Sequence, residues 1–520
     1  MQLLKLDEMT TEQKLGMTYC ARPGCQEDYD FVFEQIKKRA LGCVQVSAKR
    51  PDRVQQILEL ADYPILIICD CENGFPTSDL PKISLIALSA CNNEEYYRVF
   101  AKGVATEAKK VGFNGTWSPV VDVLHCDGPN RTHRHLSDDP MRVAKAAEII
   151  ARVYKSYGYM SSGKHYPGGG DMPYDSHMCP VPSQATKEEL MARDLIPYQY
   201  LMDRDLLPSI MTTHRTFKNI DPDNAGTMSA KVQSIIREMG FDGVCFTDSF
   251  AMMSILQKYG EDKILGLAIA AGNDIVLPNY RTRTRDAFAM LVKNYEDGLF
   301  TEERLNEAAR RVLKLHEFIA AEPECSDPFT EEDRAVFDCM ARDCITAVCD
   351  EGVSPALDPD KKHLFVVLTD NTFTPDENEM EIGADEWYHP MEISKKIRKE
   401  YPDAGIYYLP ELPNQKHNEQ LFLEATKYDD VVFITFCATK CYLGTDCLTR
   451  RVENVIDSIN LSDKLAAVVH FGNPFALKPL LHVKRKIFGY NMPDTQPYTI
   501  DVLKGTIPAK GTLPYNIEFR

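Results

Sequence analysis

The segment GKHYPGGGDMPYDSH, from Gly163 to His177, holds the residues with the clearest chemical potential. It follows a run typical of a β-strand and combines two histidines, a lysine, two aspartates and three consecutive glycines. Because Asp175 and His177 are two residues apart, the carboxylate can hydrogen-bond the imidazole, orient it and raise its basicity. Such an imidazole can donate and accept a proton near neutral pH. The plainer interpretation is a turn aspartate beside a surface histidine, since such pairs are common in loops.

Short apolar runs alternate with longer helical stretches from residue 40 to 280, which predicts repeated βα units and a parallel sheet. The runs are GCVQVSA, YPILIICD, FNGTWSPVVDV, GYMSSGKH, LPSIMTTH, FDGVCFTD and NDIVLP. Most of them close on a polar residue that can act chemically, and these residues are Asp70, Asp122, Lys164, His165, His214 and Asp248. In a (β/α)8 barrel the carboxyl ends of the strands converge on one face, where active sites are built. Single strand-end residues often cap the next helix, but such a succession favours a common site.

A second domain is predicted after the segment AEPECSDPFTEED, whose prolines and acidic residues are typical of a connection. Beyond it the apolar runs resume as KHLFVVLTD, GIYYLPE, DDVVFITFC, KLAAVVHFG and KRKIFGY. This pattern predicts a smaller doubly wound α/β domain. We therefore expect a barrel over residues 1–325, a linker over 326–340 and the second domain over 341–520. The second domain has no nucleotide-binding glycine fingerprint, so no cofactor is expected.

Composition narrows the class of protein and its partners. A chain of 520 residues is too long for one ordinary core, and 44% apolar and 26% charged residues are typical of a soluble globular protein. The net charge of −18 argues against nucleic-acid and anionic-membrane partners, which need a basic face. We expect neither a signal peptide nor a membrane-spanning helix, and the oligomeric state stays open.

The 16 cysteines are scattered along the chain, several of them inside apolar runs. That distribution favours reduced, buried thiols in a cytoplasmic protein. No CxxC pair occurs, so no structural zinc site is expected.

In the order of its motifs the chain resembles the family 3 glycoside hydrolases, and specifically the bacterial β-N-acetylglucosaminidase branch. The motifs are IICDCENG, SPVVDV, RHLSDDP, GKHYPGGGDMPYDSH, MTTH, GTMS, GFDGVCFTDSFAM, HFGNPFALKP and GTLPYNI. The resemblance implies a (β/α)8 TIM-like barrel followed by a smaller αβα sandwich domain, hydrolysis with retention of configuration, and neither metal nor cofactor.

Position by position, the resemblance implies that Asp248 is the nucleophile, which would form a covalent glycosyl ester that water later resolves. His177 takes the role of acid/base, with Asp175 as its partner. An imidazole in this role presents no second carboxylate to an anion, so phosphate could also serve as the acceptor.

The substrate-holding positions transfer in the same way. The resemblance implies that they bind sugar hydroxyls or the acetamido group, and they are Asp70, Arg134, Lys164, His165, His214 and Ser229. The last two rest only on the motifs MTTH and GTMS.

Two departures from the family pattern concern the sugar more than the reaction. Family members commonly carry a second histidine where this chain has Gly169, which implies a more flexible loop with one contact missing. After Asp70 the usual EGG followed by an arginine is replaced by Glu72, Asn73, Gly74 and Phe75.

The sequence therefore predicts a cytoplasmic, exo-acting β-N-acetylglucosaminidase that removes a terminal non-reducing N-acetylglucosamine. Cell-wall fragments are the expected natural substrate class, with chitooligosaccharides or glycan-derived disaccharides as alternatives. Alternatives within the family are a β-glucosidase, a β-xylosidase and an N-acetylglucosaminide phosphorylase. A metal-dependent amidohydrolase is a more distant alternative, with candidate ligands among His133, His135, Lys164, His214 and Asp248. A degenerate barrel that binds sugar without turnover is the other.

Overall fold

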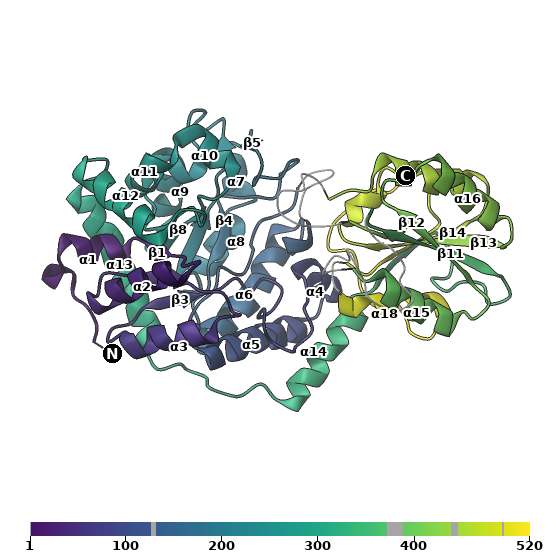
Figure 1. Cartoon of the computed structure of the whole chain (residues 1–520), viewed down its shortest axis with the longest axis horizontal. Helices are drawn as coiled ribbons and strands as arrows, with labels where there is room; N and C mark the ends of the chain where they lie inside the picture. Colours follow the sequence, from purple (N-terminus) through teal and green to yellow (C-terminus); the bar gives the residue numbers. More distant parts are fainter. Residues whose placement is uncertain (1, 126–131, 372–387, 438–445, 491–492) are drawn as a thin grey trace. The chain divides into compact units, whose positions relative to one another are not determined.

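The computed structural model divides the chain into two compact units (Figure 1). The residues that the structure describes are 2–125, 132–371, 388–437, 446–490 and 493–520. Unit 1 contains residues 2–80, 97–125 and 135–333. Unit 2 contains residues 81–96, 132–134 and the described residues from 334 to 520.

Unit 1 is a closed barrel of parallel strands. The strands are β1 (Cys20–Ala21), β2 (Cys43–Gln45), β3 (Leu66–Ile68), β4 (Gly163–Tyr166), β6 (Ser209–Thr212), β8 (Val244–Ser249) and β9 (Ile275–Leu277). They form the sheets β1-β2-β3 and β4-β6-β8-β9. Single parallel bridges join the sheets, and they pair Ile68 with Gly115, Gly115 with Met160 and Tyr19 with Val276. Gly115 thus occupies the strand position between β3 and β4. The barrel therefore has eight strand positions, which confirms the predicted (β/α)8 barrel.

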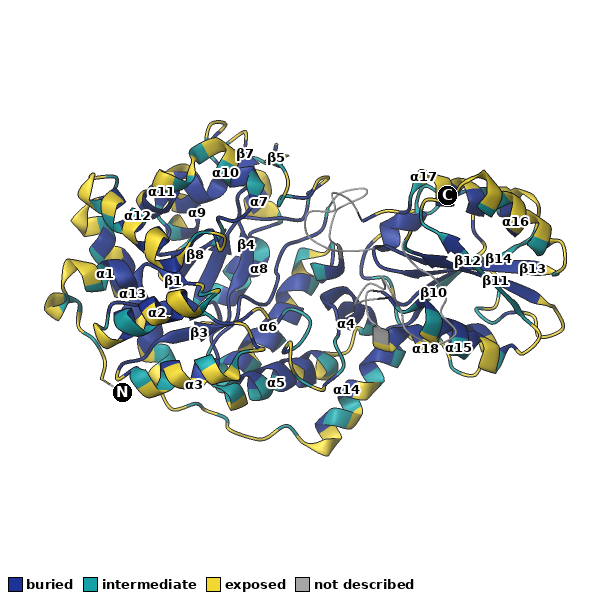
Figure 2. Ribbon diagram, in the orientation of Figure 1, coloured by how far each residue is buried: buried dark blue, intermediate teal, exposed yellow. Residues whose placement is uncertain are grey.

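Helices cover the outside of this barrel, so its strands are buried apolar runs. The helices are α1 (Thr11–Met17), α2 (Gln26–Lys37), α3 (Pro51–Leu60), α5 (Glu94–Val111), α6 (Pro140–Ser156), α7 (Lys187–Ala192), α8 (Ile196–Met202), α9 (Ala230–Glu238), α10 (Met253–Tyr259), α11 (Glu261–Ala271), α12 (Thr284–Glu296) and α13 (Glu302–Ala320). Figure 2 shows buried strands inside and exposed residues on the outer faces of these helices.

Two of the sequence motifs are helix starts. In RHLSDDP, the Asp139 carboxylate accepts hydrogen bonds from the N–H groups of Met141 and Arg142, and Pro140 occupies the first turn of α6. In GTMS, Ser229 caps α9 by accepting a hydrogen bond from the N–H of Val232 at 3.2 Å. These motifs therefore fix where helices begin.

The sequence pattern did not predict strand β1. This strand has only the two residues Cys20 and Ala21, too few to show a period. It is the first strand of the barrel because it pairs with β2 on one side, and the adjacent Tyr19 bridges to Val276 of β9 on the other.

Unit 2 is built on a six-stranded sheet in the order β10-β15-β14-β13-β11-β12. The strands are β10 (Thr346–Cys349), β11 (His363–Thr369), β12 (Gly405–Pro410), β13 (Asp430–Phe436), β14 (Leu465–Phe471) and β15 (Arg485–Phe488), and only β10 runs antiparallel to its neighbour. Figure 1 shows α16 (Gln415–Ala425) on one side of the sheet and α15 (Pro390–Glu400) and α18 (Gln496–Lys504) on the other. A further helix, α17 (Arg450–Leu461), connects β13 to β14. The predicted αβα sandwich is confirmed.

The limits of the two units differ from the expected linker over 326–340. Helix α14 (Glu331–Asp343) occupies most of that segment, and unit 1 ends within it at Asp333. In addition, residues 81–96 belong to unit 2. They include α4 (Leu85–Cys91), whose residues from Leu85 to Ala90 are all buried. The Ala90 carbonyl oxygen accepts a hydrogen bond from the N–H of Thr512 at 2.9 Å.

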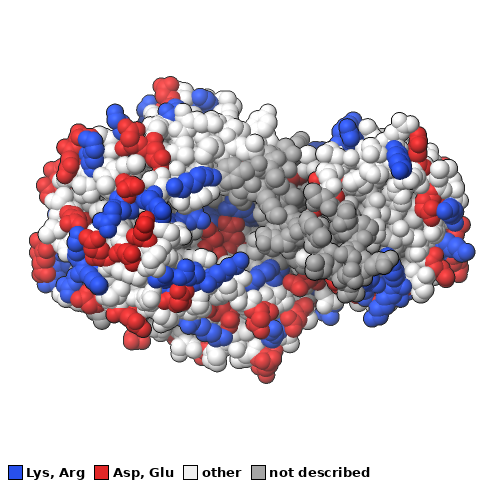
Figure 3. Space-filling view, in the orientation of Figure 1, with Lys and Arg blue, Asp and Glu red and all other residues white. Residues whose placement is uncertain are grey.

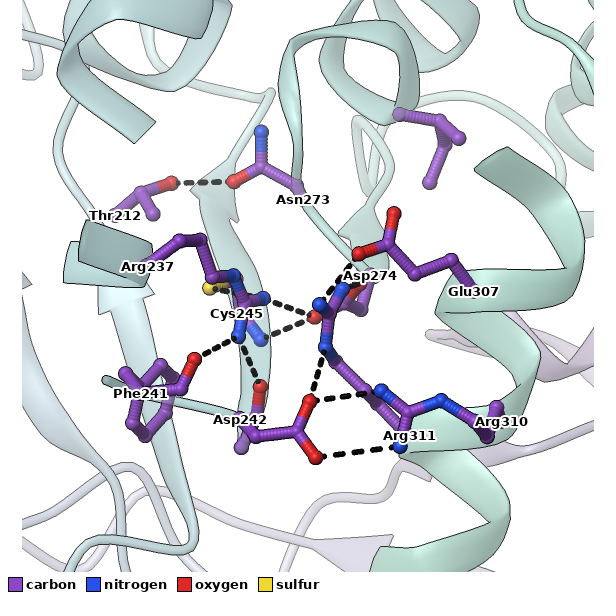
Figure 4. A network of polar contacts seen from close by, with 12 residues as sticks. Thr212, Arg237, Phe241, Asp242, Cys245, Asn273, Asp274, Glu307, Arg310 and Arg311 are labelled. Carbon is purple, nitrogen blue, oxygen red and sulfur yellow. Dashed lines mark hydrogen bonds and ion pairs between the residues drawn. The ribbon is translucent and has the colours of Figure 1, made fainter. Parts of the chain in front are cut away.

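A buried charge network lies at the amino-terminal ends of strands β8 and β9 (Figure 4). Asp274, which is 0% exposed, lies just before β9 and accepts hydrogen bonds from the guanidinium groups of Arg237, Arg304 and Arg311. It also accepts a hydrogen bond from the N–H of Cys245 in β8 at 2.9 Å. The network therefore ties two neighbouring strands to α9 and α13.

Figure 3 shows acidic and basic side chains interspersed over the face of unit 1 that is in view. The net charge of −18 is therefore spread rather than gathered on that face. Within the described ranges, no helix has the length and apolar character needed to cross a bilayer.

Candidate active site

Asp248 lies near the carboxyl end of β8, where the sequence pattern places a reactive carboxylate. Its side chain is 23% exposed, and its Oδ1 accepts a hydrogen bond from the N–H of Ser249 at 2.7 Å. Its Oδ2 lies 4.0 Å from the Nε2 of His165. The carboxylate is thus held from one side and open enough to meet a ligand.

Three imidazoles lower the pKa of this carboxylate. Burial raises the pKa of Asp248, but the electrostatic effects of His165, His214 and His177 lower it more, and the pKa ends below its ordinary value. Asp248 is therefore ionised at neutral pH, as a nucleophilic carboxylate must be.

His177 and Asp175 form the hydrogen-bonded pair that the sequence predicts. The Nδ1 of His177 lies 2.8 Å from the Oδ1 of Asp175, and the same oxygen accepts the N–H of His177 at 3.0 Å. Since an ionised carboxylate only accepts, Nδ1 carries a proton, and exchange with a substrate falls to Nε2. The carbonyl oxygen of His177 accepts a hydrogen bond from the N–H of Met253 at 2.9 Å, which fixes the middle of the loop.

Lys164 in β4 is buried and points its ammonium group at two carboxylates. One is Glu72, in close contact, and the other is Asp70, with its Oδ1 at 3.4 Å from Nζ. The Asp70 side chain is 54% exposed and can accept hydrogen bonds from a ligand. In the sequence Glu72 is only part of a departure from the family pattern, whereas in the fold it is the nearer of the two carboxylates that contact Lys164.

His165 is oriented by the buried carboxylate of Asp122. The N–H of His165 donates to Oδ1 at 2.9 Å, and its Nδ1 lies 2.8 Å from Oδ2. Burial raises the pKa of Asp122, but the charge of His165 and its hydrogen bonds outweigh this and lower the pKa to about 2. Asp122 is thus ionised and fixes the ring whose Nε2 faces Asp248.

Consecutive residues of β4 reach different partners because the register of β4 against β6 shifts between Lys164 and Tyr166. Such an irregularity re-aims a side chain that a regular pleat would turn to the other face. Lys164 accordingly contacts Asp70 while His165 approaches Asp248.

His214 lies two residues beyond β6 and is buried. Its Nε2 is 3.1 Å from the carbonyl oxygen of Ser249, and its Nδ1 is 2.9 Å from the Oγ1 of Thr227. Its ring stacks on Phe250 with the centroids 5.3 Å apart. Burial lowers the pKa of His214 despite the nearby charge of Asp248. With protein partners at both nitrogens, His214 supports the strand end that carries Asp248.

The two remaining substrate-binding candidates are Ser229 and Arg134, and the first of them has a structural role. The Ser229 side chain is fully buried, and its hydroxyl donates to Asp221 at 2.7 Å while capping α9. Arg134 ends the 3-10 helix η2 (Thr132–Arg134), which belongs to unit 2. Its role in substrate binding stays a prediction.

The glycines of the loop serve close packing. A Cβ atom at Gly169 would lie 2.8 Å from a carboxylate oxygen of Asp122, and one at Gly170 would overlap the carbonyl group of Val123. The contact with Asp122 explains why position 169 carries no side chain in this chain, where the resemblance implied a looser loop.

Sequence reasoning missed Arg215. It directly follows His214, so the only available signal was one more charged residue at a strand end. Its guanidinium group is buried against the start of the loop and pairs with Asp171.

The amidohydrolase alternative requires a cluster of metal ligands. In the part of the chain that the structure describes, no group of three or more His, Cys, Asp or Glu side chains is arranged to hold a metal ion. His165 and His177 instead have carboxylate partners that make them hydrogen-bonding or proton-transfer groups.

Curated relatives are similar to this chain in sequence. A beta-hexosaminidase of Pseudomonas aeruginosa (strain PAO1) is 30% identical over 236 residues, which cover 45% of this chain and 68% of the relative. A beta-hexosaminidase of Idiomarina loihiensis is 29% identical over 233 residues, covering 43% of this chain and 70% of the relative.

Solved structures share the fold over both units. A glycoside hydrolase family 3 beta-N-acetylglucosaminidase from Paenibacillus sp. str. FPU-7 has a TM-score of 0.80 and 23% identity, covering 98% of this chain and 99% of that chain. The beta-glucoside phosphorylase BglX has a TM-score of 0.81 and 21% identity, covering 98% of this chain and 94% of that chain.

The match that decides membership is to a family model. Residues 43–315 match the Glycosyl hydrolase family 3 N terminal domain, which spans the barrel from β2 to α13 and includes all the side chains around Asp248. The chain therefore belongs to glycosyl hydrolase family 3 and is an enzyme of that family.

Proposed function

We propose that this enzyme is a retaining exo-β-N-acetylglucosaminidase. The observation that carries the proposal is an ionised Asp248 at a barrel strand end, beside the imidazole of His177, which the buried Asp175 orients. The names of the bacterial relatives, beta-hexosaminidase, support an N-acetylhexosamine as the sugar.

In the first step, Asp248 attacks the anomeric carbon and the bond to the leaving oxygen breaks. His177 gives its Nε2 proton to that oxygen. In the second step, neutral His177 takes a proton from water while the water oxygen attacks the same carbon and releases Asp248. Asp175 accepts the Nδ1 proton's hydrogen bond throughout, so it stabilises the imidazolium and fixes the tautomer.

The residues around the nucleophile supply sugar-binding groups of both kinds. Asp70 accepts hydrogen bonds from hydroxyls, and Lys164 and His165 donate. Arg134 remains a proposed contact to a hydroxyl or the acetamido group. As the natural substrate class we propose cell-wall fragments with a terminal N-acetylglucosamine, processed in the cytoplasm.

A second candidate reaction is phosphorolysis, and the feature that favours it is the imidazole acid/base. A carboxylate base would repel an incoming phosphate, whereas His177 would not. The product would then be the sugar 1-phosphate rather than the free sugar. Incubating the enzyme with a defined disaccharide, with and without phosphate, distinguishes the two reactions by their products.

The covalent step is tested by trapping. A fluorinated N-acetylglucosaminyl inactivator should leave its adduct on the peptide containing Asp248, as identified by mass spectrometry. Asp248→Ala should lose at least about 10⁴-fold in kcat while its melting temperature stays close to that of the wild type. A label on any other residue would refute the mechanism.

The role of His177 is tested by the leaving group. His177→Ala should slow hydrolysis of a disaccharide by about 10²–10⁴-fold and that of an activated aryl glycoside far less, because only the poor leaving group needs a proton. Equal losses on both substrates would contradict the acid role.

A further inference from the structure

Arg215 is the most deeply buried arginine beside the loop that carries the acid/base dyad. It is 1% exposed and lies between His214 and β7 (Thr216–Phe217). A buried guanidinium must be paired and hydrogen-bonded, because its desolvation is otherwise costly. At this depth it is also withdrawn from a substrate, so its partners define its role.

Those partners are the first residues of the loop. One nitrogen of Arg215 donates to the carbonyl oxygen of Gly168 at 3.2 Å, and the other donates to the carbonyl oxygen of Asp171 at 3.4 Å. The guanidinium group also forms an ion pair with the Asp171 carboxylate. Both backbone carbonyls and the side chain at the loop start are thereby directed at one group.

The far end of the loop is held by the same short segment. Strand β5 (Pro182–Ser183) pairs in parallel with β7, and the N–H of Lys218 donates to the carbonyl oxygen of Ser183 at 2.9 Å. The Ser183 hydroxyl donates to the Asp171 carboxylate at 3.1 Å, which connects the two ends. The residues from 168 to 183 thus form a closed loop fastened at residues 215–218, with Asp175 and His177 near its middle.

We infer that Arg215 is a positioning residue that sets His177 at the correct distance from Asp248. This rests on the proposed function, because His177 must there deliver a proton to an oxygen bonded to the carbon that Asp248 attacks. A displacement of about 1 Å of a catalytic group can cost about 10²-fold in rate. Arg215 takes no part in the chemistry itself; it acts through the loop.

The decisive variant is Arg215→Met, which keeps the length of the side chain and removes its donors. We expect kcat on a disaccharide to fall by about 10²-fold, while kcat on an activated aryl N-acetylglucosaminide falls less than about 5-fold. In the His177→Ala background, Arg215→Met should have no further effect beyond about 2-fold, since both changes remove the same proton transfer. Arg215→Lys, which can keep one contact, should recover part of the loss.

The matched control is Arg311→Met. Arg311 is also a buried arginine of unit 1, but its partners are Asp242, Asp274 and Glu307 at the opposite end of the barrel. It should lower the melting temperature and leave the ratio of the two kcat values unchanged. Equal losses on both substrates in Arg215→Met, or a further loss in the His177→Ala background, would overturn the inference.

A readout that needs no turnover separates this inference from the proposed function. Tyr174 in the loop is 59% exposed, so chymotrypsin can reach it once the loop opens. Cleavage after Tyr174 should be at least 10-fold faster in Arg215→Met than in the wild type and unchanged in Arg311→Met. Unchanged cleavage in Arg215→Met would overturn the inference that Arg215 holds the loop, even if the wild type hydrolyses no glycoside. If Arg215→Met does not fold, Asp171→Asn replaces it, with the same expected outcomes.

Discussion

Each imidazole around Asp248 is oriented by a group behind it. Asp122 holds His165, Asp175 holds His177, and Thr227 contacts His214. Catalytic side chains must be held within about 0.5 Å of a productive geometry, and such supporting groups provide that precision. In the proposed mechanism, the supporting residues therefore matter almost as much as the groups proposed to contact the sugar.

The lowered pKa of Asp122 predicts a pH dependence of the free energy of unfolding. Its pKa is lowered to about 2 in the folded protein, from an ordinary value of 3.8. A depressed folded pKa stabilises the protein above the unfolded value, and this stabilisation is lost as the pH falls through about 2. Asp122→Asn should therefore lower the free energy of unfolding by roughly 2–3 kcal/mol at pH 7 and by only about half of that at pH 3.

Urea unfolding at the two pH values measures this difference. Asp62→Asn is the control, because Asp62 is 58% exposed and paired with Arg39 at the surface. It should change the free energy of unfolding by less than about 1 kcal/mol at either pH. An effect of Asp122→Asn that is the same at pH 7 and pH 3 would show that its charge does not contribute.

Among the elements, β8 connects the two ends of the barrel. Cys245 near its start contacts Asp274 of the charge network in Figure 4, and Asp248 near its end is the proposed nucleophile. These residues are separated by about 10 Å along the strand. Anchoring the start of β8 therefore also fixes the position of Asp248 along the strand, relative to the surrounding histidines.

Removing the central acid of that network should be costly. Asp274→Asn removes the buried charge that Arg237, Arg304 and the buried Arg311 share, and we expect a loss of about 3–5 kcal/mol in the free energy of unfolding. Urea unfolding gives the value. Asp242→Asn is the matched control, since Asp242 pairs with Arg310 and Arg311 but is 47% exposed, and it should cost less. A smaller loss for Asp274→Asn than for Asp242→Asn would contradict this account.

In the whole molecule, the two units are interleaved in the chain. Residues 81–96, which follow β3 and include the first residues of α5, belong to unit 2, where the Cys91 thiol contacts the carbonyl oxygen of Met340 at 3.6 Å. The Tyr96 hydroxyl donates to the Asp343 carboxylate at 2.8 Å. Unit 2 therefore includes a segment that comes before most of the barrel in the chain.

This arrangement predicts that the barrel cannot be cut out simply. A fragment ending at Asp333 would expose the apolar residues of α4, and burying one such Leu or Ile is worth about 1.5–3 kcal/mol. We expect the fragment to aggregate, as measured by size-exclusion chromatography. The same fragment with residues 83–92 replaced by a Gly/Ser linker should be more soluble. A monomeric, well-folded fragment with α4 intact would contradict the prediction.

The sequence alone determined the elements with a strong local signal. Apolar runs in the sequence predict seven of the eight barrel strand positions and five of the six strands of the unit 2 sheet, because parallel strands are buried on both faces. The pair Asp175 and His177 was readable because two residues of separation suffice for a hydrogen bond. Asp248 was readable as a strand-end carboxylate.

Only the tertiary structure decided which groups support these residues. Arg215 and Asp171 are 44 residues apart in the chain, and Asp122 and His165 are 43 apart. Likewise, α4 joins unit 2 through contacts with residues far along the chain. Hydrophobic periodicity reports which face of a segment is buried but not against which partner. The partners follow from closure of the barrel and from the pairing of buried charges, both of which need the folded chain.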